Sequence, residues 1–99
     1  GEAPNIDVFV ISADGSSRKE AVTALYDIRR AGISADIDYT GRSFKAQFKA
    51  AGSSGAVFAC ILGPEEVASG QVTLKDLRTA EQKSVRRAEL TDFLKTWLR

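Results

Sequence analysis

The sequence predicts an α/β domain in which helices flank a mixed five-stranded sheet, with the element order β-α-β-α-β-β-β-α. Over residues 1–62, short apolar runs rich in β-branched residues alternate with amphipathic helical patterns, which favours parallel strands joined by helices. Two further strand patterns then follow one another across a polar turn, which is typical of an antiparallel hairpin. At 99 residues, with 43% apolar and 27% charged side chains, the chain has the size and composition of a single globular domain.

The predicted strands differ in how many of their side chains are apolar. They cover residues 6–11, 33–38, 56–62, 71–75 and 81–85. The first is apolar except for Asp7 and is expected to be mostly buried, and the third is apolar throughout and is expected to be a central strand covered on two faces. The second alternates apolar with polar residues and is expected near an edge of the sheet. In the fourth, the alternation turns Val72 and Leu74 inward. Thr73 and Lys75 then lie on its outer face.

The helices are predicted from apolar side chains that recur every three to four residues, and from signals at the helix ends. They cover residues 17–31, 43–51, 64–68 and 90–98. Ser17 followed by Glu20 predicts a capping box at the start of the first helix. In the second helix, Phe44, Phe48 and Ala51 are expected to face the core. The last helix carries the longest continuous apolar stripe of the chain.

Composition excludes several kinds of protein and site. No apolar run approaches the roughly 20 residues of a membrane-spanning helix, and no signal peptide is expected. The lone cysteine, Cys60, cannot form an internal disulfide, which predicts a reducing, cytoplasmic compartment. With one cysteine and no histidine, no metal site is expected. Because the chain lacks methionine and starts with Gly-Glu-Ala-Pro, we expect a fragment of a longer protein, with residues 1–4 as a tag scar or linker.

The residues offer little for catalysis. The absence of histidine rules out a Ser-His or Cys-His pair, and Cys60 lies in the most apolar strand, where burial disfavours the reactive thiolate. Asp36 and Asp38 share one face of the edge strand, where solvated acids are commoner than an acid/base pair. Residues 14–17 join a strand to a helix start, so their amides can hold an anion or simply cap the helix. No G-x-G-x-x-G pattern is present, which favours the simple cap.

Basic side chains are concentrated in residues 41–99, which carry ten of them against six acidic ones. Arg42, Lys45 and Lys49 recur at i, i+3 and i+7, which predicts a basic stripe along one face of a helix. Tyr39 lies beside this stripe, with a ring that can stack on an unpaired base. A second basic cluster lies on the hairpin and just beyond it, and consists of Lys75, Arg78, Lys83, Arg86 and Arg87. Both patterns suit RNA, but an ordinary solvated helix face and a charge-protected edge strand would give the same patterns.

Three segments of the sequence resemble histidyl-tRNA synthetases. Residues 38–49, DYTGRSFKAQFK, resemble the family's segment D-Y-x-G-R-S-L-K-x-Q-x-K. Residues 61–66, ILGPEE, resemble its strand end I-L-G-x-x-E, and residues 72–82, VTLKDLRTAEQ, resemble its hairpin V-x-L-K-D-L-x-T-G-E-Q. The resemblance runs from about residue 6 to residue 98. It departs at Ala80, where the family often has glycine, and at Phe44, where leucine is usual.

The resemblance implies the C-terminal anticodon-binding domain of a bacterial histidyl-tRNA synthetase, with the fold that several class II synthetases share. Residues 1–99 would then form one domain that binds the anticodon stem-loop of tRNA(His) and contributes to histidylation. The RNA-binding side chains expected from the motif and the basic clusters are Tyr39, Arg42, Lys45, Gln47, Lys49, Thr73, Lys75 and Arg78.

The same resemblance implies that the chemistry belongs elsewhere. ATP and magnesium would be used by a separate catalytic domain of the parent ligase, which is then a partner of this domain, and no cofactor is expected here. The isolated domain is expected to be a monomer, because the catalytic domains carry most of the dimer contacts in the family. The alternative is a domain of a synthetase-like paralogue that contacts protein or serves regulation. A stand-alone enzyme that uses Cys60 or the Asp36 and Asp38 pair is disfavoured.

Overall fold

The computed structural model describes residues 6–98, so the expectation that residues 1–4 are a tag scar or linker lies outside the described residues. Along the chain the elements are β1 (Val8–Ser12), the 3₁₀ turn η1 (Gly15–Ser17), α1 (Arg18–Arg30), β2 (Ala35–Ile37), α2 (Phe44–Ser53), β3 (Phe58–Leu62), α3 (Pro64–Ser69), β4 (Gln71–Asp76), β5 (Gln82–Arg86), the 3₁₀ turn η2 (Arg87–Glu89) and α4 (Leu90–Trp97). Within residues 6–98, no helix is long and apolar enough to cross a membrane.

The five strands form one mixed sheet in the order β2-β1-β3-β4-β5. β1 pairs in parallel with β2 on one side and with β3 on the other. β4 runs antiparallel to β3, and β5 runs antiparallel to β4. The sequence prediction of a mixed five-stranded sheet is confirmed, with the all-apolar strand β3 at its centre and the alternating strand β2 at an edge.

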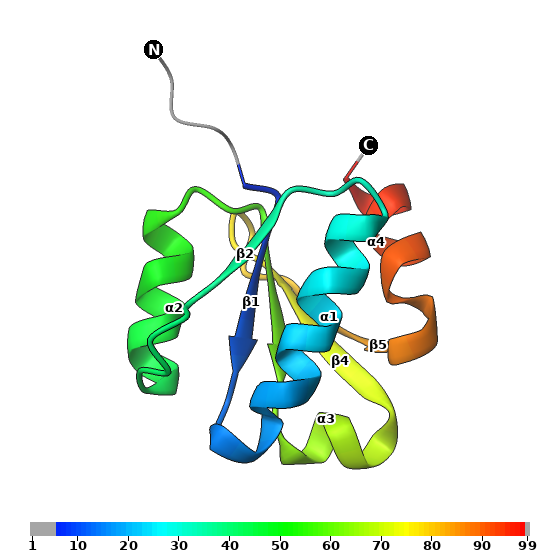
Figure 1. The fold of residues 1–99 in the computed structure, drawn as a ribbon. Coiled ribbons are helices and arrows are strands. Elements are labelled where there is room, and N and C mark those ends of the chain that lie inside the picture. The colour runs from blue at the N-terminus through cyan, green and yellow to red at the C-terminus, as the bar shows by residue number, and fades with distance from the viewer. Residues whose placement is uncertain (1–5, 99) are drawn as a thin grey trace.

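Helices cover the two faces of the sheet unequally (Figure 1). α1 and α4 lie over one face and enclose the larger core, which includes Val10, Phe58 and Leu74. α2 covers part of the other face and packs on a smaller core that includes Phe9 and Ile61. Because β1 and β3 contribute side chains to both cores, every residue of these two strands is buried. This double coverage explains their nearly uninterrupted apolar sequences.

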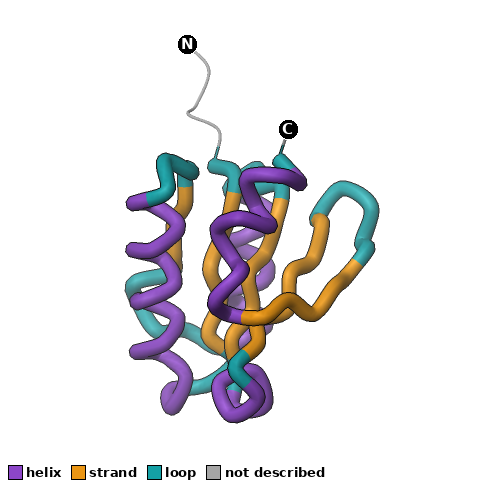
Figure 2. Tube along the Cα trace, turned by 90° about the vertical axis from the view of Figure 1, so that its right-hand side faces the viewer, coloured by secondary structure: helices purple, strands orange, loops and turns teal. Residues whose placement is uncertain are grey.

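The hairpin of β4 and β5 extends away from the helices (Figure 2). The buried side chains of Val72 and Leu74 alternate with half-buried side chains on the outer face of β4, as predicted. The register places Thr73 between Ile61 of β3 and Ser84 of β5. On this outer face α2 packs against residues of β1 and β3. The hairpin therefore presents a polar surface beside α2.

The start of the first helix differs from the prediction. Asp14 caps the 3₁₀ turn that precedes α1, and its carboxylate accepts a hydrogen bond from the backbone nitrogen of Ser17 at 3.2 Å. The hydroxyl of Ser17 donates to the same carboxylate at 3.0 Å and makes no helix cap. The predicted capping box of Ser17 and Glu20 is wrong, because an ionised acceptor one turn earlier takes the capping position. Ser43 does cap α2, with Ala46 as the donor at 3.2 Å.

Candidate nucleic-acid interface

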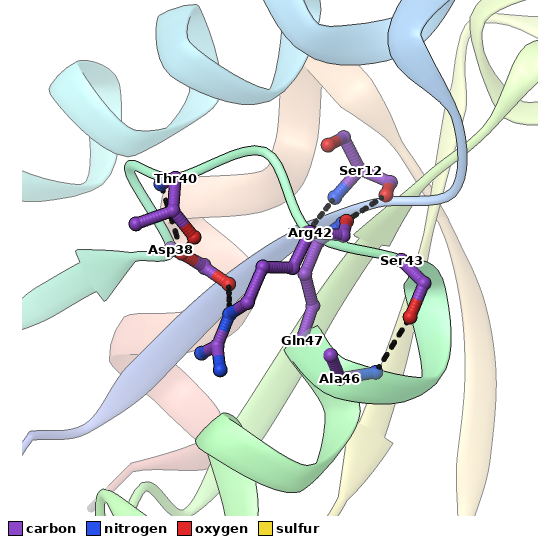
Figure 3. A network of polar contacts seen from close by, with 7 residues as sticks. All are labelled: Ser12, Asp38, Thr40, Arg42, Ser43, Ala46 and Gln47. Atoms are coloured by element: carbon purple, nitrogen blue, oxygen red, sulfur yellow. Dashed lines mark hydrogen bonds and ion pairs between the residues drawn. The ribbon is translucent and has the colours of Figure 1, made fainter.

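A buried carboxylate organises the turn that follows β2 (Figure 3). Asp38 is 7% exposed and accepts hydrogen bonds from the backbone nitrogen and the hydroxyl of Thr40, at 2.9 and 2.5 Å. Nε of Arg42 donates to its second oxygen at 2.7 Å. The bonds from Thr40, and then the one from Arg42, lower the pKa of Asp38 to about 2, because they favour the charged form. Asp38 is thus a fixed, paired anion and not a solvated edge-strand acid.

A buried glutamine joins this turn to the end of β1. Gln47 is 3% exposed, and its side chain bonds both backbone groups of Ser12: Oε1 accepts from the nitrogen at 3.0 Å, and Nε2 donates to the carbonyl at 2.9 Å. Nε2 also donates to the carbonyl of Arg42 at 2.8 Å. The sequence suggested direct RNA binding by Gln47. In the structure, its buried side chain bonds backbone groups and supports the turn that carries Arg42.

Two expectations about the start of α2 are wrong. Arg42 precedes the N-cap residue Ser43 and is therefore not on the helix, and its guanidinium turns back to Asp38 instead of extending the basic stripe. Phe44 is 39% exposed and does not lie in the core, although its ring centroid is 5.4 Å from that of Phe48. The physical reason is that an open pocket, and not the sheet, lies beneath the first turn of α2.

Lys45 and Lys49 remain as the exposed basic stripe of α2, one helical turn apart. Phe48 lies between them in the sequence and packs partly against the smaller core. Its ring centroid is 5.2 Å from Nζ of Lys75 on β4, so Phe48 lies on the side of α2 that faces the hairpin. Lys45, at i−3 from Phe48, lies near this side of α2, whereas Lys49, at i+1, is turned further towards solvent.

The hairpin continues the polar surface from α2. Thr73 and Lys75 are half-buried on the outer face of β4, and the exposed Ser84 and Gln82 lie opposite them on β5. Hydroxyl, amide and ammonium groups together offer donors and acceptors to unpaired bases and to phosphates. We name this region the α2–hairpin surface. It consists of Lys45 and Lys49 on α2 and of Thr73 and Lys75 on β4.

Arg78 lies at the hairpin tip, in the turn between β4 and β5. Its guanidinium bonds both oxygens of the buried Asp76, at 3.3 and 3.1 Å. The backbone nitrogens of Arg78 and Thr79 donate to the same carboxylate, and the bond from the Arg78 side chain is the main cause that lowers the pKa of Asp76. Because β4 runs antiparallel to β3, the tip lies at the end of the sheet where β3 begins. Arg42 lies at the opposite end, beside the end of β1.

Tyr39 is 66% exposed at the end of the edge strand β2. Its hydroxyl accepts a hydrogen bond from Nη2 of Arg29 on α1 at 3.3 Å. Arg29 also donates through Nε to the carbonyl of Ala35 at 2.9 Å and lies 3.6 Å from the carboxylate of Asp36. The tyrosine ring is thus held from one side by an anchored arginine. Sequence reasoning missed Arg29, because it is ten positions from Tyr39 and no local pattern links the two residues.

The structure therefore divides the expected RNA-binding side chains into groups. Lys45, Lys49, Thr73 and Lys75 lie together on the α2–hairpin surface. Tyr39 and Arg42 form a second group at the turn between β2 and α2, and the strand order places this turn at the edge of the sheet away from the hairpin. Arg78 at the hairpin tip and the buried Gln47 belong to neither group.

The other side chains considered for catalysis are either buried or bonded to neighbouring residues. Cys60 is fully buried, and burial raises the pKa of its thiol to about 12, so the thiol stays protonated at neutral pH. Asp36 lies beside Arg29, whereas Asp38 is bonded to Arg42, so the two acids do not act as a pair. Over residues 6–98, no group of three or more His, Cys, Asp or Glu residues is arranged to hold a metal ion.

Relatives of known identity match this chain along most of its length. The anticodon binding domain family matches residues 7–97. The chain is 39% identical over 88 residues to the histidine–tRNA ligase of Halothermothrix orenii, covering 89% of this chain and 21% of that protein. It is 47% identical over 83 residues to the histidine–tRNA ligase of Anaeromyxobacter sp. (strain K), covering 84% of this chain and 20% of that protein. The chain thus spans about a fifth of the length of these relatives.

Solved structures share the same fold. Apo histidyl-tRNA synthetase of S. aureus has a TM-score of 0.84 at 30% identity, over 91% of this chain and 26% of that chain. Histidyl-tRNA synthetase of Nostoc sp. PCC 7120 has a TM-score of 0.88 at 28% identity, over 97% of this chain and 23% of that chain. The RNA binding domain of threonyl-tRNA synthetase from Cryptosporidium parvum Iowa II reaches 0.83 at 17% identity, over 97% of this chain and 25% of that chain, which is a likeness of fold. With a family match across residues 7–97, the chain belongs to the anticodon binding domain family.

Proposed function

We propose that this chain is the anticodon-binding domain of a histidyl-tRNA synthetase and that it binds the anticodon stem-loop of tRNA(His). The observation that carries this proposal is the contact of Lys75 with the Phe48 ring, which joins the polar outer face of the hairpin to α2 and its exposed lysines in a member of the anticodon binding domain family. Ammonium groups attract backbone phosphates. The polar side chains of an open sheet face offer hydrogen bonds to the unpaired bases of a loop.

The turn between β2 and α2 extends the proposed interface. Tyr39 presents an exposed ring, and because Arg29 holds its hydroxyl, little side-chain freedom is lost when a base stacks on the ring. Arg42 is bonded through Nε to Asp38, while 55% of its side chain is exposed. Its remaining donors suit a phosphate. In this proposal Asp38 and Gln47 position these two side chains and do not contact the RNA.

In the same proposal the domain binds RNA and does not catalyse. ATP and magnesium are used by a separate catalytic domain of a cytoplasmic parent ligase, which is the partner of this domain. Two features support this division: the sequence contains no histidine, and the thiol of Cys60 is held protonated. We expect the isolated chain to sediment as a monomer and to show no ATP–pyrophosphate exchange with histidine and ATP. Exchange above a protein-free control would contradict a purely RNA-binding role.

Fluorescence anisotropy with a labelled anticodon stem-loop of tRNA(His), and with a scrambled-loop version, tests the binding. Lys45→Glu and Lys49→Glu reverse charges on the α2–hairpin surface. Lys95→Glu is the matched control, because Lys95 is equally exposed but lies on α4, on the opposite side of the sheet. Each α2 variant is expected to weaken binding by about tenfold. Each should also reduce the slope of log affinity against log salt by roughly 0.7 to 1.

The parent is expected to bind at about micromolar dissociation constants or more weakly, since affinities in this range are usual for a domain without its other contacts. It should prefer the tRNA(His) loop over the scrambled one. If all three Lys→Glu variants bind like the parent and neither loop is preferred, the α2–hairpin surface is an ordinary solvated face. That result would favour a paralogue domain that contacts protein or serves regulation.

A further inference from the structure

A pocket of about 390 Å³ lies at the carboxyl end of β1, where the chain turns towards α1 on one face of the sheet and where α2 begins on the other. In open α/β sheets, the crevice between such diverging connections is the usual place for a ligand. Its walls include Ser12, Asp14 and Arg18 from the first connection and Arg42, Phe44 and Gln47 from the second. The second wall includes Arg42, which the proposed RNA interface already uses, whereas Arg18 on the first wall has no part in it.

Arg18 lines the pocket, and part of its guanidinium has no bonding partner in the portion of the chain that the structure describes. Its Nη1 atom is shielded from solvent, yet no hydrogen-bond partner among the described residues reaches it. No ion pair to Arg18 is present within residues 6–98 either. Arg42 on the opposite wall differs, because its charge is paired with Asp38 at 2.7 Å. A shielded nitrogen without a partner costs free energy, and a water, an ion or a ligand can supply the missing partner.

The backbone around the pocket also favours a negative group. The first turns of two helical segments line it, at Gly15 in η1 and at Ser43 and Phe44 of α2. Helix starts carry a partial positive charge and amides that point outward from the axis. Asp14 is the one acidic side chain of the lining, and its Oδ1 is occupied by bonds from Ser16 and Ser17. Arg18 and the helix starts together therefore outweigh a single carboxylate.

We propose that this pocket binds a phosphate group, with the guanidinium of Arg18 as its main charged partner. The fork of donors on an arginine matches phosphate oxygens, and the helix starts add amide donors. Two sources supply this chemistry: a phosphodiester of the bound RNA, or free phosphate. The first source rests on the proposed function, since it requires RNA on this chain. The exposed ring of Phe44 at the rim then lies beside the nucleotide that carries the phosphate.

Titration with inorganic phosphate, followed by amide NMR shifts, tests the site without RNA. The parent should show saturable shifts at Gly15, Ser43 and Phe44. Arg18→Gln should weaken phosphate binding by about tenfold or more, and Arg18→Lys should restore part of it. Asp14→Asn, which keeps a helix cap but removes the opposing charge, should tighten binding about two- to fivefold. Lys19→Gln is the matched control, because it removes the same charge from an exposed neighbour outside the pocket.

The second arm measures the anticodon stem-loop with the same variants. If the phosphate is part of the RNA, Arg18→Gln weakens RNA binding and lowers the salt slope by roughly 0.7, whereas Lys19→Gln changes both less. If Arg18→Gln loses phosphate shifts but binds RNA like the parent, the site serves free phosphate. Absent or non-saturable phosphate shifts in the folded parent overturn the proposal, as does parent-like phosphate binding by Arg18→Gln. Failure of every variant and of the parent to bind RNA would count against the proposed function while leaving the phosphate result intact.

Discussion

The ammonium nitrogen of Lys75 lies 5.2 Å from the centroid of the Phe48 ring, so the hairpin and α2 meet through a cation and an aromatic face. The contact holds a long, flexible side chain against a partly buried ring. It also keeps the charge of Lys75 at the boundary between the helix and the sheet. The two halves of the α2–hairpin surface are therefore coupled by an interaction that can be measured directly.

A double-mutant cycle of Phe48→Leu and Lys75→Met should give a coupling of about 0.5–1 kcal/mol in the free energy of unfolding. Phe48→Leu keeps an apolar side chain but removes the aromatic face, and Lys75→Met keeps the length but removes the charge. Urea unfolding of the four proteins provides the measurement. A coupling of zero would mean that the two groups are merely neighbours, and the surface would then lack this connection.

Acid unfolding should depend on Asp38. Its folded-state pKa of about 2 lies below the ordinary value of 3.8, so its ionisation stabilises the fold above about pH 4. This contribution is lost as the pH falls from about 4 to about 2. Asp38→Asn should lower the free energy of unfolding by about 1–3 kcal/mol near neutral pH, because the bonds to Thr40 and Arg42 are weakened.

The difference in melting temperature between the parent and Asp38→Asn, followed from pH 7 to pH 2, isolates this carboxylate from the other acids with lowered pKa values. The difference should shrink steadily across the acid range. A difference that stays constant over that range would show that the ionisation of Asp38 is not linked to stability.

Replacing Ala80 by glycine should stabilise the hairpin. Ala80 has φ of 65°, a left-handed conformation that costs an alanine more than a glycine, and the resembling family often has glycine at this position. Ala80→Gly is expected to raise the free energy of unfolding by about 0.5–1 kcal/mol. The control is Ala68→Gly in α3, which should lower it by about the same amount. Urea midpoints decide between these signs, and a loss of stability in Ala80→Gly would argue against strain at the turn.

The thiol of Cys60 should be silent towards alkylating reagents until the chain unfolds. Its pKa of about 12 leaves almost no thiolate at neutral pH, and its side chain has no exposure. The labelling rate should therefore rise with urea in parallel with unfolding. Ser53→Cys, at an exposed position at the end of α2, should take up one label rapidly under native conditions. Equal rates for the two cysteines would mean that β3 opens readily.

The sequence predicted the fold correctly wherever the pattern of apolar and polar residues reflects which side chains are buried. The uninterrupted apolar run of β3 predicted its central place, and the alternation along β4 predicted which side chains turn outward. Both predictions were correct, because burial on two faces or on one face imposes these patterns on any strand.

The features that could not be predicted depend on how helices and strands distant in the sequence are placed relative to one another. Phe44 fits an apolar helical face, but it lines an open pocket at the start of α2 and is exposed. Gln47 reads as one more polar residue of a basic segment, yet it bonds the backbone of Ser12, which is 35 residues away in the sequence. No local periodicity encodes such a contact. The pocket likewise joins residues 12–18 to residues 41–47, so the sequence alone showed residues 14–17 only as a helix cap or as amides that can hold an anion.

The strand order has a consequence for the stage of synthesis at which the α2–hairpin surface is complete. β1 is made first but lies between β2 and β3, both of which follow it, and Lys75 emerges after all three. A nascent chain that ends before β4 contains Lys45 and Lys49 but has no hairpin to lie beside them. An incomplete product of this kind would therefore lack half of the surface to which RNA binding is assigned in the proposed function.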